Sequence, residues 1–191
     1  LRRQRQMCIR DRFTSGEMKK DFYLMIGAFA PNKRVDLAIR VFNRLKLPLK
    51  IVGKGQDEAF CRSIAGESIS FLGECDDEQL LELYQQARAF VFPGEDDFGI
   101  TPLEAQACGT PVIAYAAGGA LETVTETTGI FFEEQTEEAL SHAVEEMEQR
   151  HLDFKPEDFK KNTSQFSRER YKNEMFNTIN NAYSSWNLKS P

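Results

Sequence analysis

The chain has few of the residues that hold metals, and it has no long apolar run. Its 191 residues include two histidines and four cysteines, and the cysteines show neither paired spacing nor a cluster with histidine. We therefore expect no metal site, and we interpret Cys61, Cys75 and Cys108 as buried or half-buried thiols in a reducing cytosol. No run of 18 apolar residues occurs, so the sequence predicts no membrane-spanning helix.

The chain also lacks a positive balance of charge. Residues 1–12 carry five Arg and one Asp, and the string RRQRQMCIRD matches one reading frame of a common transposon-type sequencing adapter. We interpret residues 1–12 as an assembly artefact, followed by a linker or remnant over residues 13–20, and expect the natural gene to continue upstream. A nucleic-acid arm and a transit peptide are the alternative interpretations. Without residues 1–12 the formal net charge moves from −6 to −10, which argues against nucleic acid as a partner.

What the sequence does contain is a regular alternation of short apolar runs and amphipathic segments. Six strands separated by helices predict an α/β fold: a Rossmann-like, doubly wound, six-stranded parallel sheet with C-terminal helices. We expect this domain over residues 21–165 and a C-terminal helix and tail over residues 166–191. The predicted strands are 22–27, 49–53, 69–73, 89–92, 111–115 and 129–132. The predicted helices are 34–45, 57–65, 76–87, 102–109, 118–124, 136–149, 156–162 and 167–183.

The most informative stretch is FPGEDDFGITPLE, residues 92–104, which joins the fourth strand to a helix. Parallel sheets of this kind bind ligands beyond the carboxyl ends of their strands. Two carboxylates, Asp96 and Glu104, are separated by seven residues across this join. Helix-start amides beside two acids suit a ligand that has both phosphate and hydroxyl groups, such as a sugar nucleotide.

Other loops at the same rim supply a positive charge and close backbone approach. Lys33 and Arg34 follow the first strand, where a cation can neutralise a diphosphate leaving group. Gly53 and Gly55 lack the remaining glycine of a dinucleotide fingerprint, so we expect no NAD site there and a close approach by either a base or backbone. Glycine turns at 94, 99 and 118–119 permit close approach of the backbone, and amides near residues 99–101 can hold phosphate oxygens.

Residues 21–183 resemble the C-terminal, donor-binding half of GT-B glycosyltransferases, specifically the retaining enzymes of family 4. The matching strings are YLMIGAFAPNKRVDLAI, LKIVGKG, ISFLGECDDEQLLELYQQARAFVFP, EDDFGITPLEAQACGTPVIAYAAGGALETV and FSRERY. Within this family the chain is most similar to mannosyltransferases of bacterial O-antigen and exopolysaccharide assembly.

The resemblance implies a role for each matching residue. Glu104 would bind the nucleotide ribose and Asp96 the hydroxyls of the donor sugar. Lys33 would hold the diphosphate together with the amides of residues 99–101, which makes Lys33, Asp96 and Glu104 the catalytic set. The full donor-binding set is Lys33, Arg34, Gly53, Gly73, Glu95, Asp96, Phe98, Gly99, Ile100, Thr101, Glu104, Gly118 and Gly119.

The chain departs from the family pattern at two positions. Asp96 is one methylene shorter than the usual glutamate, and Glu95 is a possible substitute for it. Ala28 stands where many relatives carry an arginine, so Lys33, with Arg34, would carry more of the diphosphate charge.

From the resemblance we expect a retaining transfer from a nucleotide sugar, GDP- or UDP-linked with GDP-mannose favoured, to a saccharide or lipid-linked saccharide. No metal or other cofactor is expected. The resemblance also implies a preceding N-terminal domain, without which this fragment is inactive, and a protein that is cytoplasmic or peripheral at the inner face of the plasma membrane.

Two other functions stay open on the sequence. One is a non-catalytic nucleotide-sugar-binding module or degenerate partner subunit, which Ala28 and Asp96 favour. The other is a nucleotide-sugar 2-epimerase, which shares the architecture but lacks this motif string. The final predicted helix has Tyr171, Met175, Ile179 and Tyr183 at four-residue intervals, a pattern typical of packing either against its own domain or against the missing half.

Overall fold

The computed structural model describes residues 21–187, so our interpretations of residues 1–12 and 13–20, and Cys8, lie outside the described residues. The described part forms the predicted alternation of strands and helices. In chain order the elements are β1 (Tyr23–Ile26), the 3₁₀ helix η1 (Pro31–Lys33), α2 (Val35–Leu45), β2 (Leu49–Val52), α3 (Glu58–Ile64), β3 (Ile69–Gly73), α4 (Asp77–Gln86), β4 (Ala89–Phe92), α5 (Ile100–Ala107), β5 (Val112–Tyr115), α6 (Ala120–Thr123), β6 (Gly129–Phe132), α7 (Glu137–Arg150), α8 (Pro156–Ser164) and α9 (Arg168–Asn187).

The six strands form one parallel sheet in the order β3-β2-β1-β4-β5-β6. The first strand lies in the middle of the sheet, since Tyr23 pairs with Leu49 of β2 on one side and with Ala89 of β4 on the other. Strand order reverses between β1 and β4, and ligands of such sheets bind at that switch point. The predicted fold class is confirmed.

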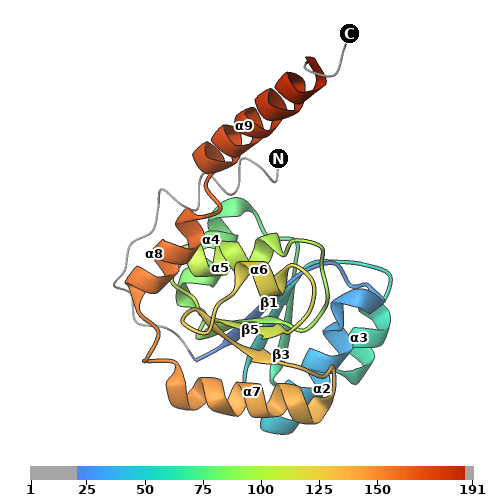
Figure 1. Cartoon of the computed structure of the whole chain (residues 1–191). Coiled ribbons are helices and arrows are strands. Elements are labelled where there is room, and N and C mark those ends of the chain that lie inside the picture. Colours follow the sequence, from blue (N-terminus) through green and yellow to red (C-terminus); the bar gives the residue numbers. More distant parts are fainter. Residues whose placement is uncertain (1–20, 188–191) are drawn as a thin grey trace.

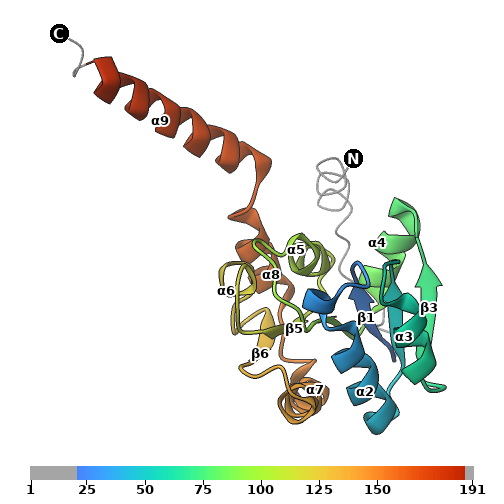
Figure 2. The same cartoon turned by 90° about the vertical axis from the view of Figure 1, so that its right-hand side faces the viewer.

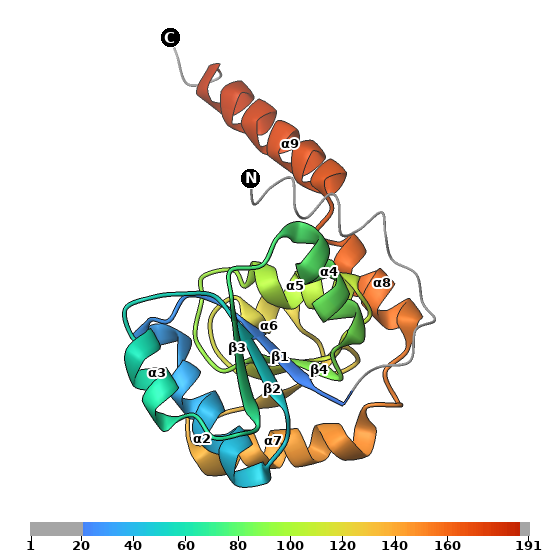
Figure 3. The same cartoon turned by 180° about the vertical axis from the view of Figure 1, so that it is seen from behind.

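Helices cover both faces of the sheet (Figures 1 and 3), with α2, α3 and α7 on one face and α4, α5 and α8 on the other. Alternate residues of β1 divide between the two layers: Tyr23 and Met25 join the core under α2 and α7, and Leu24 joins the core under α4 and α5. All four residues of β4 are buried, as expected for a central strand covered on both faces. Cys61 and Cys108 are buried and Cys75 is half-buried, as predicted.

Helix boundaries follow local chemistry. Asp76 caps α4 by accepting a hydrogen bond from the Gln79 amide at 2.9 Å, and the Gln79 side chain accepts one from the Asp76 amide. Helix α5 begins at Ile100, two residues before the predicted start at Pro102. Proline is tolerated in the first helical turn, because the amides there have no acceptor within the helix and the missing amide hydrogen of Pro102 costs no hydrogen bond.

Helix α9 projects away from the body of the domain (Figure 2). Its apolar side chains are exposed: Tyr171 to 57%, Ile179 to 58% and Tyr183 to 68%. Packing of this stripe against its own domain, one of the two expectations from the sequence, is therefore wrong. None of the helices within residues 21–187 is both long and apolar enough to cross a membrane.

Candidate ligand site at the carboxyl rim of the sheet

The loops that follow β1 and β4 meet at the switch point and bring Lys33 to Asp96. The Lys33 ammonium donates a hydrogen bond to an Asp96 carboxylate oxygen and forms an ion pair with it. Gly94 makes this contact possible, because a Cβ there would lie 2.4 Å from the Asn32 carbonyl oxygen and 2.6 Å from the Lys33 Cα. The Glu95 amide then donates to the Asn32 carbonyl at 3.2 Å. Both side chains of the pair stay partly open, at 22% and 27% exposed.

The loop after β5 holds the same acidic loop from its other side. The Gly119 amide donates a hydrogen bond to the Asp96 carbonyl oxygen at 2.7 Å. Side chains would not fit here, since a Cβ at Gly118 would lie 2.5 Å from that oxygen and one at Gly119 would lie 2.4 Å from the Phe98 Cα. The close approach at these two glycines is made by the protein's own backbone, and their assignment to a donor-binding set stays a prediction.

The start of α5 presents backbone amides at the rim. Gly99 precedes the helix in the left-handed conformation, with φ of 72°, and no side chain caps the helix start. Ile100 and Thr101 form its first turn, which carries no acidic residue. An uncapped helix start of this kind attracts anions through its amides and the helix dipole.

Glu104 lies one turn further along α5 and is buried, with 4% of its surface exposed. A buried carboxylate needs hydrogen bonds to offset its lost hydration. The Tyr84 hydroxyl on α4 donates one to Glu104 Oε2 at 2.9 Å. The sequence indicated that Glu104 differs from a solvated surface acid, but the apolar pattern of α4 gave no reason to single out Tyr84.

Arg34 follows Lys33 directly, yet its guanidinium has other partners. It donates to Gln135 Oε1 at 3.1 Å and lies 3.5 Å from Asp36. Gln135 in turn donates to the Pro93 carbonyl at 2.8 Å, so Arg34 is linked through it to the acidic loop. Arg34 has φ of 51°, a left-handed conformation that a non-glycine residue seldom adopts outside functional or constrained turns. Sequence reasoning missed Gln135, which lies outside the matching motif strings.

The other glycines that the sequence placed at the rim differ in whether a side chain would fit there. A Cβ at Gly53 would lie 1.9 Å from the Gly27 carbonyl oxygen and one at Gly55 would lie 2.4 Å from the Phe29 carbonyl oxygen, so backbone fills both spaces. Gly73 ends β3 with φ of 69°, and a Cβ there would meet nothing within 4 Å, which leaves open space beside it.

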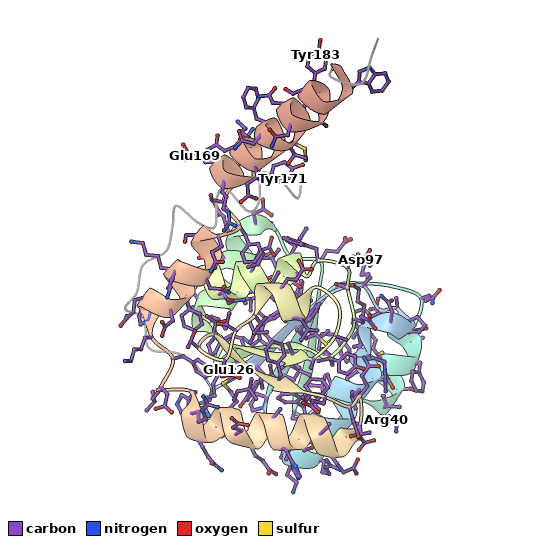
Figure 4. All side chains as sticks on the ribbon, viewed as in Figure 1. Arg40, Asp97, Glu126, Glu169, Tyr171 and Tyr183 are labelled. Atoms are coloured by element: carbon purple, nitrogen blue, oxygen red, sulfur yellow. The ribbon has the colours of Figure 1, made fainter. Side chains whose placement is uncertain are left out.

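Two further residues of the acidic loop face outward. Glu95 is exposed, and Phe98 is 40% exposed and packs edge-on against Phe166, with ring centroids 5.9 Å apart. Figure 4 shows Asp97, from the same loop, at the surface of the domain. Among residues 21–187, no group of three or more His, Cys, Asp or Glu side chains is arranged to hold a metal ion.

Comparisons with known proteins find related sequences and similar structures. The family model described as "Glycosyl transferases group 1" matches residues 9–166. A GDP-mannose-dependent monoacylated alpha-(1-6)-phosphatidylinositol monomannoside mannosyltransferase from Corynebacterium glutamicum is 36% identical over 110 residues, 52% of this chain and 29% of that protein. The O-antigen chain mannosyltransferase C of Escherichia coli is 30% identical over 136 residues, 66% of this chain and 37% of that protein. The chain thus spans about a third of the curated relatives' length.

Solved structures share the fold. A sucrose-phosphate synthase from Thermosynechococcus elongatus superposes with a TM-score of 0.75 at 25% identity, over 87% of this chain and 46% of that one. The Anabaena protein HepE in complex with UDP also gives a TM-score of 0.75, at 17% identity, over 94% of this chain and 52% of that one.

Proposed function

Because the chain belongs to the group 1 glycosyl transferases, we propose that its rim around Lys33, Asp96 and Glu104 binds a nucleotide-sugar donor. The observation that carries this proposal is the Lys33–Asp96 contact across the switch point. It places a cation and a carboxylate, both partly open, in the loops that flank the position where such sheets bind ligands.

The contact between Lys33 and Asp96 indicates how the site would receive its substrate. The diphosphate replaces Asp96 as the partner of the Lys33 ammonium, and the amides of Ile100 and Thr101 add hydrogen bonds to its oxygens. Asp96, released from Lys33, accepts hydrogen bonds from hydroxyls of the donor sugar, while Glu104 accepts them from the ribose.

The reaction we propose is a glycosyl transfer with retention. The bond between the anomeric carbon and the diphosphate oxygen breaks, and Lys33 stabilises the charge that develops on the departing diphosphate. The acceptor hydroxyl oxygen bonds to the anomeric carbon from the same face and gives its proton to the departing diphosphate oxygen. The step needs no metal or other cofactor, since Lys33 and the start of α5 supply the positive field.

We propose GDP-mannose as the donor and a saccharide or lipid-linked saccharide as the acceptor. The support is that both mannosyltransferases named above align with this half of the molecule, and that one is named for its dependence on GDP-mannose. The acceptor site would lie in an N-terminal domain of the full-length protein, which would be cytoplasmic or peripheral at the membrane's inner face.

Calorimetry and turnover assays with GDP-, UDP- and ADP-sugars on the full-length protein test the proposal. We expect binding of GDP-mannose, transfer of mannose, and a loss of about a hundredfold in kcat/KM for Glu104→Ala. Near-normal kinetics of that variant would refute the role of Glu104.

A non-catalytic nucleotide-sugar-binding module is the second candidate. It is favoured by exposed Ala28, at a position where many relatives carry an arginine, and by Asp96, which is one methylene shorter than the usual glutamate. Tight donor binding without turnover, in a protein containing both domains, would select it.

A further inference from the structure

A tyrosine outside the acidic motif contacts the motif's second acid. Tyr84 is fully buried on α4, and its hydroxyl donates a hydrogen bond to Glu104 Oε2 at 2.9 Å. The ring is fixed by Phe90 of β4, with centroids 5.7 Å apart, and its backbone carbonyl accepts a hydrogen bond from the buried Thr110 hydroxyl.

These contacts leave Tyr84 little freedom to move. Phe90 of the sheet packs against its ring, and Thr110, in the connection between α5 and β5, holds its backbone. A hydrogen bond to one oxygen of a carboxylate restricts rotation of the whole group, so Tyr84 also determines the direction of Glu104 Oε1. In a buried site such a bond is stronger than in water, and its loss leaves the carboxylate poorly solvated.

We propose that Tyr84 is a positioning residue that orients Glu104 toward the two hydroxyls of the donor ribose. The inference rests on the proposed function, because it assigns Tyr84 to the nucleotide half of that site. It predicts that Tyr84 affects how strongly the protein prefers ribose to a sugar that lacks the 2′ and 3′ hydroxyls. A purely structural contact would not affect this preference.

The test is titration calorimetry of GDP and of 2′,3′-dideoxy-GDP with the full chain. Wild-type protein should bind GDP more tightly than the dideoxy analogue. Tyr84→Phe, which removes only the hydroxyl, should weaken GDP binding about tenfold and reduce that preference by a similar factor. Glu104→Gln should remove most of the preference, and adding Tyr84→Phe to it should change the preference no further.

Tyr23→Phe is the matched control. The Tyr23 hydroxyl also donates to a glutamate, Glu148, but from the first residue of β1, at the opposite end of the same sheet. This variant should keep the wild-type preference for GDP over its dideoxy analogue.

Three results would overturn the inference, and they separate it from the proposed function. If Glu104→Gln loses the preference while Tyr84→Phe keeps it, Tyr84 has no positioning role and the donor site stands. If the Tyr84→Phe protein is unfolded and the double variant Tyr84→Phe/Glu104→Gln is folded, the role of Tyr84 is structural only. If wild-type protein binds neither GDP nor UDP, the proposed function fails and the inference fails with it.

Discussion

At the scale of single residues, two groups of rim glycines differ in what surrounds them. At Gly94, Gly118 and Gly119 neighbouring backbone occupies the space of a side chain, so these glycines let three loops pack onto one another. At Gly27 and Gly73 that space is empty. The first kind builds the site by holding Lys33 and Asp96 in contact, and the second leaves room beside it.

We expect Gly94→Ala to destabilise the protein by about 2–3 kcal/mol, since its Cβ would meet backbone atoms that cannot rotate away. It should also weaken donor binding, because the Lys33 loop would have to shift. Urea denaturation and GDP calorimetry measure the two effects.

Gly27→Ala is the matched control. The added Cβ would meet nothing within 4 Å and the backbone of Gly27 is not left-handed. We therefore expect the free energy of unfolding to change by no more than about 0.5 kcal/mol. Equal destabilisation by the two substitutions would contradict the assignment of Gly94 to loop packing.

At the scale of elements, the sequence predicted every strand, because short apolar runs bounded by glycine or proline are typical of buried parallel strands. It did not predict η1 or the early start of α5, since both depend on how proline and left-handed residues shape a turn. The sequence placed Lys33 and Asp96 at one rim, because both loops follow strands that flank the switch point, but it did not predict the direct ion pair between them. Tyr84 and Gln135 were missed because contacts between helices and between loops leave no periodic signal.

One cluster joins three elements at the end of the sheet away from the candidate site. Glu148 of α7 accepts hydrogen bonds from Tyr23 of β1 and from Arg88, next to β4. Burial acts to raise the pKa of Glu148, but the hydrogen bonds from Arg88 and Tyr23 outweigh it, so that the pKa is lowered in the folded protein.

Glu148→Gln should therefore lower the free energy of unfolding by about 1 kcal/mol at pH 7 and by almost nothing at pH 3. A carboxyl whose folded pKa is lowered stabilises the fold above its unfolded pKa, about 4.3 for Glu, and loses that contribution as the pH falls through the folded value. Urea denaturation of wild type and variant at pH 7 and pH 3 measures this. If the difference in unfolding free energy between wild type and variant were the same at both pH values, Glu148 would act through packing and not through its charge.

At the scale of the whole molecule, the domain carries half of the proposed active site and an extended helix. Figure 4 shows Tyr171 and Tyr183 along α9, clear of the domain body. Met175, Phe176 and Trp186 of the same helix are exposed to 42%, 65% and 72%. We propose that in the full-length enzyme this surface contacts an N-terminal domain.

Ile179→Asp should leave the stability of residues 21–187 unchanged, since the side chain is 58% exposed there. In the full-length protein it should lower the melting temperature and the turnover rate, because a charge would enter an apolar contact. Asn180→Asp, a neighbouring polar position of α9, is the control. If the two variants of the full-length protein had the same melting temperature and turnover rate, the exposed apolar side chains of α9 would make no contact with another domain.

The proposed donor site is tested most directly by a crystal structure of the protein with GDP-mannose. We expect the diphosphate between the Lys33 ammonium and the amides at the start of α5, the ribose hydroxyls on Glu104, and Asp96 turned from Lys33 to the mannose. A donor bound elsewhere, with the Lys33–Asp96 pair intact, would show that this rim is not the donor site.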